Sequence, residues 1–398
     1  MDLLLVLGVV LVAAFVGGQL AHKLTLPSVT GYILVGVVLG SSVTGLLGAA
    51  ELAALEPINA FALGLIGLSI GGELKWRFLA QKWQNFGLLF LGESLTTLLL
   101  VVIVIGALSR NLALALILGV LALAPAPATI LGVVRDYKTR GRFPGEVMSL
   151  VALDSLWCIL AFTVVTTLLN LYYYGIQPGK GVLGHIATEI GPAIVLGVLL
   201  GFVGVNITNR IPLPKQRQVL ITALLFLAVG LPRYLGISYL LVTLLTGTII
   251  VNMTPKFRRF FDALQTVDAP VLVVFLTLAG ARLQLQALPA VGILGAAYVV
   301  SRLLGKLLGS RLADASCRML PTSCSRINPT HRRYIGLART PQAGVAIGLS
   351  LLAEQQLPLP EGVVVTVIVG SVILFQLIGP PLIVKALRET GSIAEDAT

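Results

Sequence analysis

Charged residues are scarce in this chain. Asp, Glu, Lys and Arg make up 11% of its 398 residues, whereas a soluble globular domain carries about 25%. Hydrophobic residues reach 57%, and the mean hydropathy is +0.96. This balance excludes an ordinary soluble domain. It predicts an all-α polytopic membrane protein whose surroundings are membrane lipid.

Cysteine and phosphate-binding motifs are also scarce or absent. Three cysteines cannot build a disulfide framework, and Cys317 and Cys324, in a loop expected in the cytoplasm, are predicted to be free thiols. No G-x-x-x-x-G-K-[ST] segment is present, so nothing indicates a nucleotide partner or ATP as the driving force. We expect no enzyme activity, no catalytic residue and no cofactor.

Long apolar runs fill most of the chain. A helix that crosses the hydrocarbon core needs about 20 apolar residues. Judged by this length, the sequence predicts 13 transmembrane helices, of which the third, eighth and ninth are short. They lie near residues 3–21, 28–48, 57–73, 84–107, 112–134, 145–170, 189–208, 219–232, 237–252, 270–288, 291–313, 334–356 and 362–386.

The formal net charge of +11 could indicate a nucleic-acid partner, but the placement of the basic residues indicates membrane topology instead. Most of them lie in the odd-numbered connections between the predicted spans and after the last span. The even-numbered connections carry only Arg110, Lys180, Arg233 and Arg282. By the positive-inside rule, the odd connections and the C-terminus are cytoplasmic and the N-terminus is outside.

Proline interrupts two of the predicted spans. The fifth breaks at Pro125 and Pro127, and the twelfth breaks at Thr340 and Pro341. These spans are seven helices apart and run in opposite directions, so the chain reads as two inverted six-helix repeats joined by the seventh helix. Matching broken helices in inverted repeats are typical of secondary transporters, whose site lies near the midplane. The alternative is that these prolines only kink their helices.

Asp154 is the only acid in the interior of the predicted sixth span. A carboxylate at that depth costs at least ~2.5 kcal/mol, which favours a functional role. It could supply a ligand and a neutralising charge to a monovalent metal cation, with the hydroxyls of Ser155 and Thr129 and freed carbonyls completing the shell. It could instead take a proton, and a group that holds one or the other is a minimal exchange device. A structural Asp154, bonded to a helix end, is the alternative.

Basic residues are also embedded in the predicted spans. Lys306 could pair with Asp154, or its head could reach the cytoplasmic surface. Arg302 lies one turn deeper and could form a buried charge pair with Glu93 of the fourth span. Arg339 is expected to cap carbonyls freed by the twelfth-span break.

Several segments of the chain resemble the monovalent cation:proton antiporter-2 family, within the sodium/proton antiporter superfamily, and together they span nearly the whole sequence. They are Leu26-Pro27-Ser28-Val29-Thr30-Gly31-Tyr32-Ile33-Leu34-Val35-Gly36, Gly67 to Leu74 ending in Gly-Gly-Glu-Leu, the fifth-span break, Ala152-Leu153-Asp154-Ser155, Gly305-Lys306 and Pro341-Gln342-Ala343-Gly344-Val345-Ala346.

The resemblance implies a homodimer in a bacterial inner (plasma) membrane that exchanges Na⁺ or K⁺ for H⁺. Asp154 would match the ion-binding aspartate and Lys306 its partner. The sodium/proton antiporter fold would cross its two broken helices near Asp154, and a core would move against a scaffold in an elevator-like step. Scaffold helices would occupy 1–83 and 216–290, core helices 84–170 and 291–398, and a linker helix 171–215.

The sequence departs from the family pattern at the site. Leu153 stands where the family usually has Asp, Asn or Gln, and Pro125-Ala126-Pro127-Ala128-Thr129 replaces a Thr/Ser-Pro-Thr type break. Gly280-Ala281-Arg282-Leu283 replaces Gly-Leu-x-Leu. The predicted site is thus poorer in oxygen ligands than usual. Two other hypotheses remain: a carrier of the same fold for another solute such as an organic anion, and a non-transporting sensor or assembly subunit.

Overall fold

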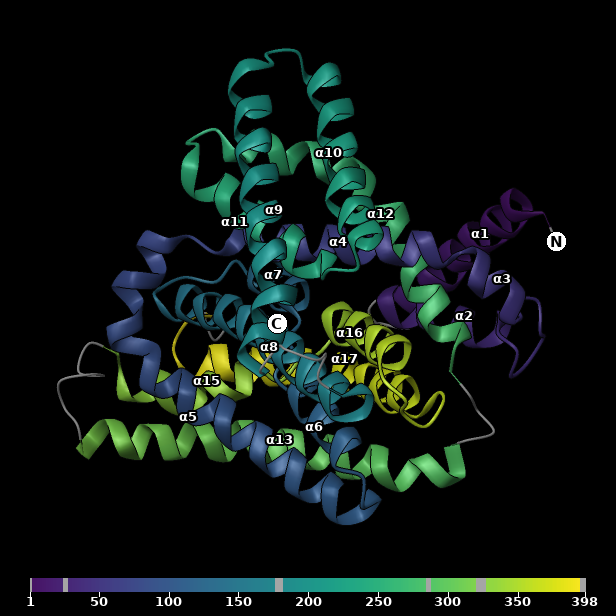
Figure 1. Cartoon of the computed structure of the whole chain (residues 1–398). Coiled ribbons are helices and arrows are strands. Elements are labelled where there is room, and N and C mark those ends of the chain that lie inside the picture. The colour runs from purple at the N-terminus through teal and green to yellow at the C-terminus, as the bar shows by residue number, and fades with distance from the viewer. Residues whose placement is uncertain (1, 24–27, 176–181, 284–287, 320–326, 394–398) are drawn as a thin grey trace. The chain divides into compact units, whose positions relative to one another are not determined.

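The computed structural model describes residues 2–23, 28–175, 182–283, 288–319 and 327–393, and within these ranges the chain forms helices and no strand (Figure 1). The first two residues of the Leu26-Pro27 motif and Cys324 lie outside them. The helices are α1 (Leu3–Lys23), α2 (Ser28–Leu39), α3 (Ala49–Ala54), α4 (Glu56–Glu73), α5 (Trp76–Ser109), α6 (Leu112–Leu121), α7 (Pro127–Asp136), α8 (Phe143–Tyr174), α9 (Val182–Arg210), α10 (Pro214–Leu235), α11 (Tyr239–Met253), α12 (Phe257–Ala281), α13 (Leu288–Met319), α15 (Pro329–Ala338), α16 (Gly344–Gln356) and α17 (Val363–Glu389).

The helices agree with an integral membrane protein. Seven helices in the described ranges are long and apolar enough to cross a bilayer, and α12 makes an eighth if its two segments, bent by 46°, form one span. The apolar helices α2, α6 and α11 are shorter. A helix or a broken pair of helices overlaps each predicted range, while the count of 13 spans stays a prediction.

The second predicted span ends earlier than expected. The sequence predicted it over 28–48, but α2 ends at Leu39, and the chain then turns back so that both the amide and the hydroxyl of Thr44 donate to the Val38 carbonyl. Gly45 lies in the left-handed region, with φ of +69°, which suits glycine. An apolar run therefore overestimates this helix because a turn of small residues follows it.

The chain divides into two compact units. Unit 1 contains Met1–Trp76 and Ile159–Leu283, and unit 2 contains Arg77–Cys158 and Gln284–Thr398. The chain passes between the units at the start of α5, in the middle of α8 and after Leu283.

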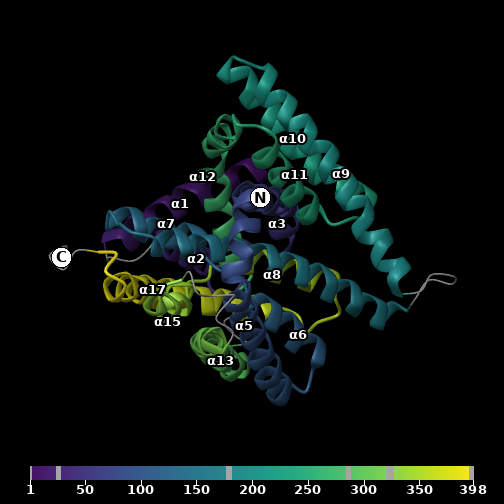
Figure 2. The same cartoon turned by 90° about the vertical axis from the view of Figure 1, so that its left-hand side faces the viewer.

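Unit 1 is assembled by close helix crossings at glycine. A Cβ on Gly36 of α2 would lie 1.9 Å from the Thr277 carbonyl oxygen of α12, and one on Gly71 of α4 would lie 2.0 Å from that of Leu244 on α11. Helix α11 packs against α4, α9 and α10, and α9 and α10 lie side by side in both views (Figures 1 and 2). Small residues at helix contacts are typical of membrane proteins, where lipid gives no hydrophobic drive to association.

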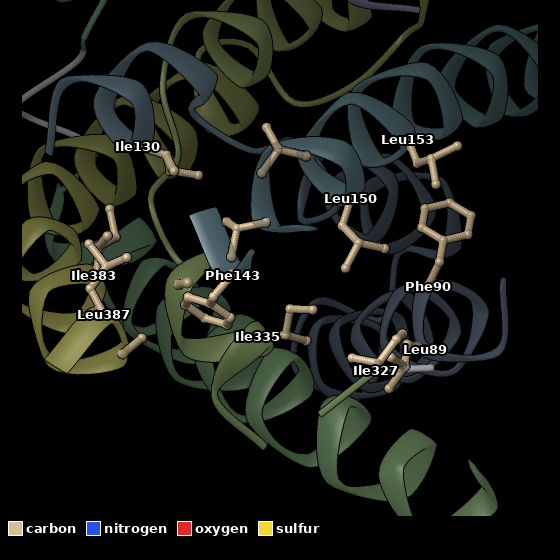
Figure 3. Close-up of a cluster of buried hydrophobic side chains, with 14 of the residues drawn as sticks. Leu89, Phe90, Ile130, Phe143, Leu150, Leu153, Ile327, Ile335, Ile383 and Leu387 are labelled. Atoms are coloured by element: carbon tan, nitrogen blue, oxygen red, sulfur yellow. The ribbon is translucent and has the colours of Figure 1, made fainter. Parts of the chain in front are cut away.

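Unit 2 contains the helices that carry the embedded charges. Helices α13, α15 and α17 contact one another, and α17 also packs against α6, α7 and α16. One apolar cluster joins α5, α8, α15 and α17, and it includes Phe90, Phe143, Leu150, Leu153 and Ile383 (Figure 3).

One cysteine prediction is wrong. Cys317, in the last turns of α13, is disulfide-bonded rather than a free thiol, and its partner lies outside the described residues. Cys158 is the free, buried cysteine among those described. The prediction relied on the expected cytoplasmic location of this segment, and location alone does not decide the state of an individual cysteine.

Candidate ion-binding site

Two helix breaks form the frame of the site. Helix α6 ends at Leu121 and α7 begins at Pro127, so Pro125 lies in the non-helical link. Helix α15 ends at Ala338 and α16 begins at Gly344, with Thr340 and Pro341 between them. Proline removes an amide donor and clashes with the preceding turn, so both breaks leave carbonyl oxygens without a helical partner.

Arg302 of α13 binds carbonyl oxygens at both breaks. Its Nε donates to the Ala122 oxygen at 2.9 Å and its Nη2 to the Ala124 oxygen at 3.0 Å, while its Nη1 donates to the Thr340 oxygen at 2.6 Å. The guanidinium also lies 4.4 Å from the ring centre of Phe375. One fully buried side chain thus ties the end of α6 to the end of α15.

Amide side chains make a second link across the breaks. Gln342 donates to the Leu121 oxygen and to the Tyr298 hydroxyl, both at 2.9 Å. Gln376 of α17 donates to the Gln342 oxygen at 3.1 Å and accepts from the Thr129 hydroxyl at 3.1 Å. Thr129, at the first break, and Gln342, at the second, therefore share one side chain as a partner.

A four-residue charged cluster, Glu93, Asp154, Lys306 and Arg339, lies next to this frame. Lys306 Nζ is 2.9 Å from Glu93 Oε1 and 3.8 Å from Asp154 Oδ2. Arg339 bridges the two acids, pairing with Glu93 and donating to Asp154 Oδ1 at 3.3 Å. All four side chains are at most 2% exposed, so none of them reaches the surface of the structure.

Ser94 is a further member that sequence reasoning missed. Its hydroxyl lies 3.5 Å from Asp154 Oδ1, at the long limit of a hydrogen bond. The available signal was a polar side chain in an apolar span, next to Glu93 in the sequence. Together with the carboxylates, it adds an oxygen ligand that a monovalent cation could use.

Glycines bring α5 and α13 together at the cluster. A Cβ on Gly305 would lie 2.6 Å from the Thr97 Cα, and one on Gly309 would lie 2.6 Å from the Glu93 Cα. The spacing Gly305-Lys306-Leu307-Leu308-Gly309 is the small-xxx-small pattern that allows helix backbones to approach closely. Lys306, between these glycines, is therefore within reach of Glu93.

Polar pairs hold the other end of α15, the helix that delivers Arg339. Each pair joins α15 to a different neighbour, α8, α13 or α17. The pairs are His331 with Glu146 at 2.8 Å, Arg332 with Asp314 at 3.2 Å and Tyr334 with Glu389 at 3.0 Å.

The charges of the site balance if the helix ends are counted. Lys306 and Arg339 offset Glu93 and Asp154. Each helix C-terminus carries about half a negative charge, and the ends of α6 and α15 together offset Arg302. A proton and a monovalent cation each carry one positive charge, so either one bound at Asp154 raises the net charge of the site by one.

The structure changes several of the expected contacts. Glu93 pairs with Lys306 and Arg339, not with Arg302. The carbonyl-capping contact expected for Arg339 is made by Arg302, because α13 lies against both breaks and Arg339 points to the acids. The Ser155 hydroxyl donates to the Val151 oxygen of its own helix at 3.0 Å. Asp154 and Lys306 do lie within ion-pair distance.

Leu153 faces away from the charged cluster. Its side chain is buried in the apolar cluster of unit 2, with Phe90 as a fellow member (Figure 3). Successive residues on a helix point about 100° apart. The apolar residue at this position thus contributes to packing, and Glu93 of α5 supplies the second carboxylate near Asp154.

Comparisons with known proteins identify a family and a similar fold. A family profile described as sodium/hydrogen exchanger, transmembrane, matches residues 10–388. The structure is similar to that of the sodium proton antiporter MjNhaP1 from Methanocaldococcus jannaschii at pH 8, with a TM-score of 0.76 and 18% identity over 98% of this chain and 100% of that one. An electron-microscopy structure of the same antiporter has a TM-score of 0.65 and 19% identity, with both chains covered fully. No curated protein sequence matches the chain.

Proposed function

Because the chain belongs to the sodium/hydrogen exchanger family, we propose that it is a secondary active antiporter exchanging a monovalent cation, Na⁺ or K⁺, for H⁺, with Asp154 binding either ion in competition. The observation that carries this proposal is the burial of Asp154 beside Ser94, Lys306 and Arg339, next to two broken helices. Buried ionisable groups in membrane helices mark ion and proton pathways. We also propose the narrower assignment to the monovalent cation:proton antiporter-2 family, which the motifs around Asp154, Lys306 and Pro341 support.

Competition at one carboxylate couples the two fluxes. A cation that binds Asp154 must displace its proton and compete with the positive charge of Arg339, whose Nη1 lies 3.3 Å from the carboxylate. Glu93 can hold Arg339 and Lys306 while this happens, since it already contacts both. Each cycle then carries one cation one way and one proton the other way.

The wider architecture is part of the same proposal. Unit 2 would be the transport core and unit 1 the scaffold that dimerises, with an elevator-like movement between them. The division of the chain into two units that each combine segments from both halves supports it, as do the two breaks joined by Arg302. Thirteen spans in two inverted repeats, an inner-membrane location and a cytoplasmic C-terminus complete the proposal.

A carrier of an organic anion is the second candidate. The observation in its favour is an excess of buried basic side chains. Three of them, Arg302, Lys306 and Arg339, are buried in unit 2 near the site, against the two acids Glu93 and Asp154. The commitment of Arg302 to carbonyl oxygens weakens it.

Proton flux in proteoliposomes tests the proposal directly. Purified protein is reconstituted with a trapped pH dye, and Na⁺, K⁺ and Li⁺ gradients are applied separately. We expect at least one of these cations to drive proton movement that empty vesicles lack. Absence of flux with all three, over a range of pH, would contradict antiport and favour the anion carrier.

Currents on solid-supported membranes test the stoichiometry. One-for-one exchange moves no net charge, so we expect no sustained Na⁺-driven current. A lysine desolvated in the core can release a proton of its own, and the cycle would then be electrogenic. A sustained current that survives collapse of the proton gradient, and disappears in Lys306→Gln, would overturn the electroneutral scheme.

A further inference from the structure

Thr97 of α5 carries a buried hydroxyl that has no hydrogen-bond partner among the described residues. Its side chain is 0% exposed. A threonine inside a helix can donate to a carbonyl oxygen three or four residues earlier, and the adjacent Thr96 does so, with its hydroxyl 2.6 Å from the Gly92 oxygen. Leaving a buried hydroxyl unpaired is costly, so the free oxygen of Thr97 needs an explanation.

Most other buried threonines of the described chain satisfy their hydroxyls locally. Thr163, Thr166 and Thr208 each donate to a carbonyl oxygen of their own helix. Thr30 and Thr366 share the unpaired state of Thr97, but they lie on α2 and α17, which carry no member of the charged cluster. Thr97 lies on α5 with Glu93.

The Thr97 side chain lies on the face of α5 that meets the site. Successive residues of a helix are about 100° apart, so Thr97 projects roughly 40° from the direction of Glu93 and about 60° from that of Ser94. Its Cα–Cβ bond tilts toward the start of the helix, and thus toward the level of these two residues. Glu93 contacts Lys306, and Ser94 contacts Asp154.

The crossing of α5 with α13 fixes the same level from the other side. A Cβ on Gly305 would lie 2.6 Å from the Cα and 3.1 Å from the hydroxyl oxygen of Thr97, and one on Gly309 would lie 2.6 Å from the Glu93 Cα. The two helices therefore run in opposite directions, with Lys306 between these two contacts. Since residue 305 has no side chain, none covers the Thr97 hydroxyl there.

We propose that Thr97 is a further ligand of the transported cation, whose free hydroxyl oxygen joins the Ser94 hydroxyl and the Asp154 carboxylate around the ion and contributes to selectivity for the cation over the proton. The inference rests on the proposed cation exchange. The Thr97 oxygen can turn to an ion without giving up a hydrogen bond, whereas the Ser155 hydroxyl already donates to the Val151 oxygen. A proton on Asp154 needs no shell of oxygen ligands, so Thr97 should affect cation binding and not proton binding.

Cation-driven proton flux in proteoliposomes, measured over a range of pH, tests this role. Thr97→Val keeps the shape of the side chain and removes its hydroxyl. We expect the apparent KM for the driving cation to rise about three- to tenfold, the contribution of one neutral oxygen contact. Maximal flux, and the pH at which protons begin to compete, should stay as in wild type. Thr97→Ser should restore the wild-type KM.

The matched control is Thr96→Val, which removes the neighbouring hydroxyl that is already bonded within α5. Its apparent KM should remain that of wild type. An unchanged KM in folded Thr97→Val, an equal rise in Thr96→Val, or a raised KM in Thr97→Ser overturns the inference. If Thr97→Val does not fold, Thr97→Ala, which adds no bulk at the crossing, should show the same rise in KM, and a wild-type KM there overturns it equally.

Thermal melting separates the inference from the proposed function, because it reports binding without transport. A ligand that binds the folded state raises the melting temperature, so NaCl or KCl, compared with choline chloride, should stabilise wild type. The concentration for half of this effect should be about three- to tenfold higher in Thr97→Val. With that shift but no wild-type flux, antiport would fail and the ligand role would stand. With wild-type flux but no shift, the ligand role would fail and antiport would stand.

Discussion

The two units solve the problem of burying polar groups in different ways. In unit 1, the hydroxyls of Thr243, Thr246 and Thr248 donate to carbonyls of their own helix, and the helices meet at glycine. The salt bridge between Arg233 and Glu56 stays accessible, with side chains 38% and 25% exposed.

Unit 2 instead buries a whole set of charges. Taking an ion out of water costs several kcal/mol, and the apolar cluster of unit 2 contains none of these charges. Such costly charges, collected beside two broken helices, therefore indicate a functional role. The contrast predicts that changes to the buried charges of unit 2 affect transport, stability or both, and that changes in unit 1 affect stability alone.

The largest expected effect is that of Asp154→Asn. The amide keeps the shape of the side chain but can neither neutralise a cation nor exchange a proton, so flux in proteoliposomes should fall to that of empty vesicles. The protein should still elute as wild type in size-exclusion chromatography. Thr163→Val, which removes a buried hydroxyl further along α8, is the control and should keep its flux. Normal exchange by Asp154→Asn would remove this residue from the mechanism.

The buried ion pair of Lys306 and Glu93 should dominate the stability of unit 2. Glu93→Gln leaves Lys306 and Arg339 short of negative charge in a dry site, and breaking a buried pair typically costs about 3–5 kcal/mol. Chemical denaturation in detergent would measure this loss.

The matched variant for that pair removes both partners. Replacing Glu93 by Leu and Lys306 by Met leaves Arg339 with Asp154 and no unpaired lysine. We expect it to unfold at a higher denaturant concentration than Glu93→Gln, because replacing both ions costs less than stranding one. Equal loss in the two variants would mean that the pair is not coupled.

The sequence identified the embedded residues better than their contacts. Asp154, Lys306, Arg302, Glu93 and Arg339 stand out because each charge interrupts an apolar run, and the structure gathers all of them in one unit. Their ion-binding role remains a prediction.

The pairing was harder to predict because it depends on how helices cross. Arg302 and Arg339 exchanged their expected partners. Arg339 lies at a helix break, where its direction does not follow from helical periodicity, and the neighbours of Arg302 in the middle of α13 depend on how that helix packs. The approach of Glu93 to Lys306 depends on Gly305 and Gly309, whose small-xxx-small spacing indicates a close helix contact but not which helix makes it. The early end of α2 and the bonded Cys317 are likewise set by contacts that a hydropathy pattern does not contain.

A glycine substitution in unit 1 should have a moderate effect that leaves the ion site untouched. In Gly71→Ala, the added methyl would lie 2.0 Å from the Leu244 oxygen, so α4 and α11 must separate. Overpacking of this kind costs about 1–3 kcal/mol. Gly8→Ala in α1, where nothing lies within 4 Å of the added carbon, is the control. The melting temperature should fall in the first variant only, while the apparent cation affinity of the surviving protein stays as in wild type.

The smallest expected effect is that of Arg233→Ala. This variant removes an ion pair of the same chemistry as Lys306 and Glu93, but the Arg233–Glu56 pair is exposed. Water already solvates both groups, and salt screens their attraction, so the pair should contribute about 0–1 kcal/mol. Flux should not change, and the small loss of stability should shrink further as salt is added. A loss as large as that of Glu93→Gln would show that burial does not separate the two pairs, and the contrast between the units would then have to rest on something other than solvent exposure.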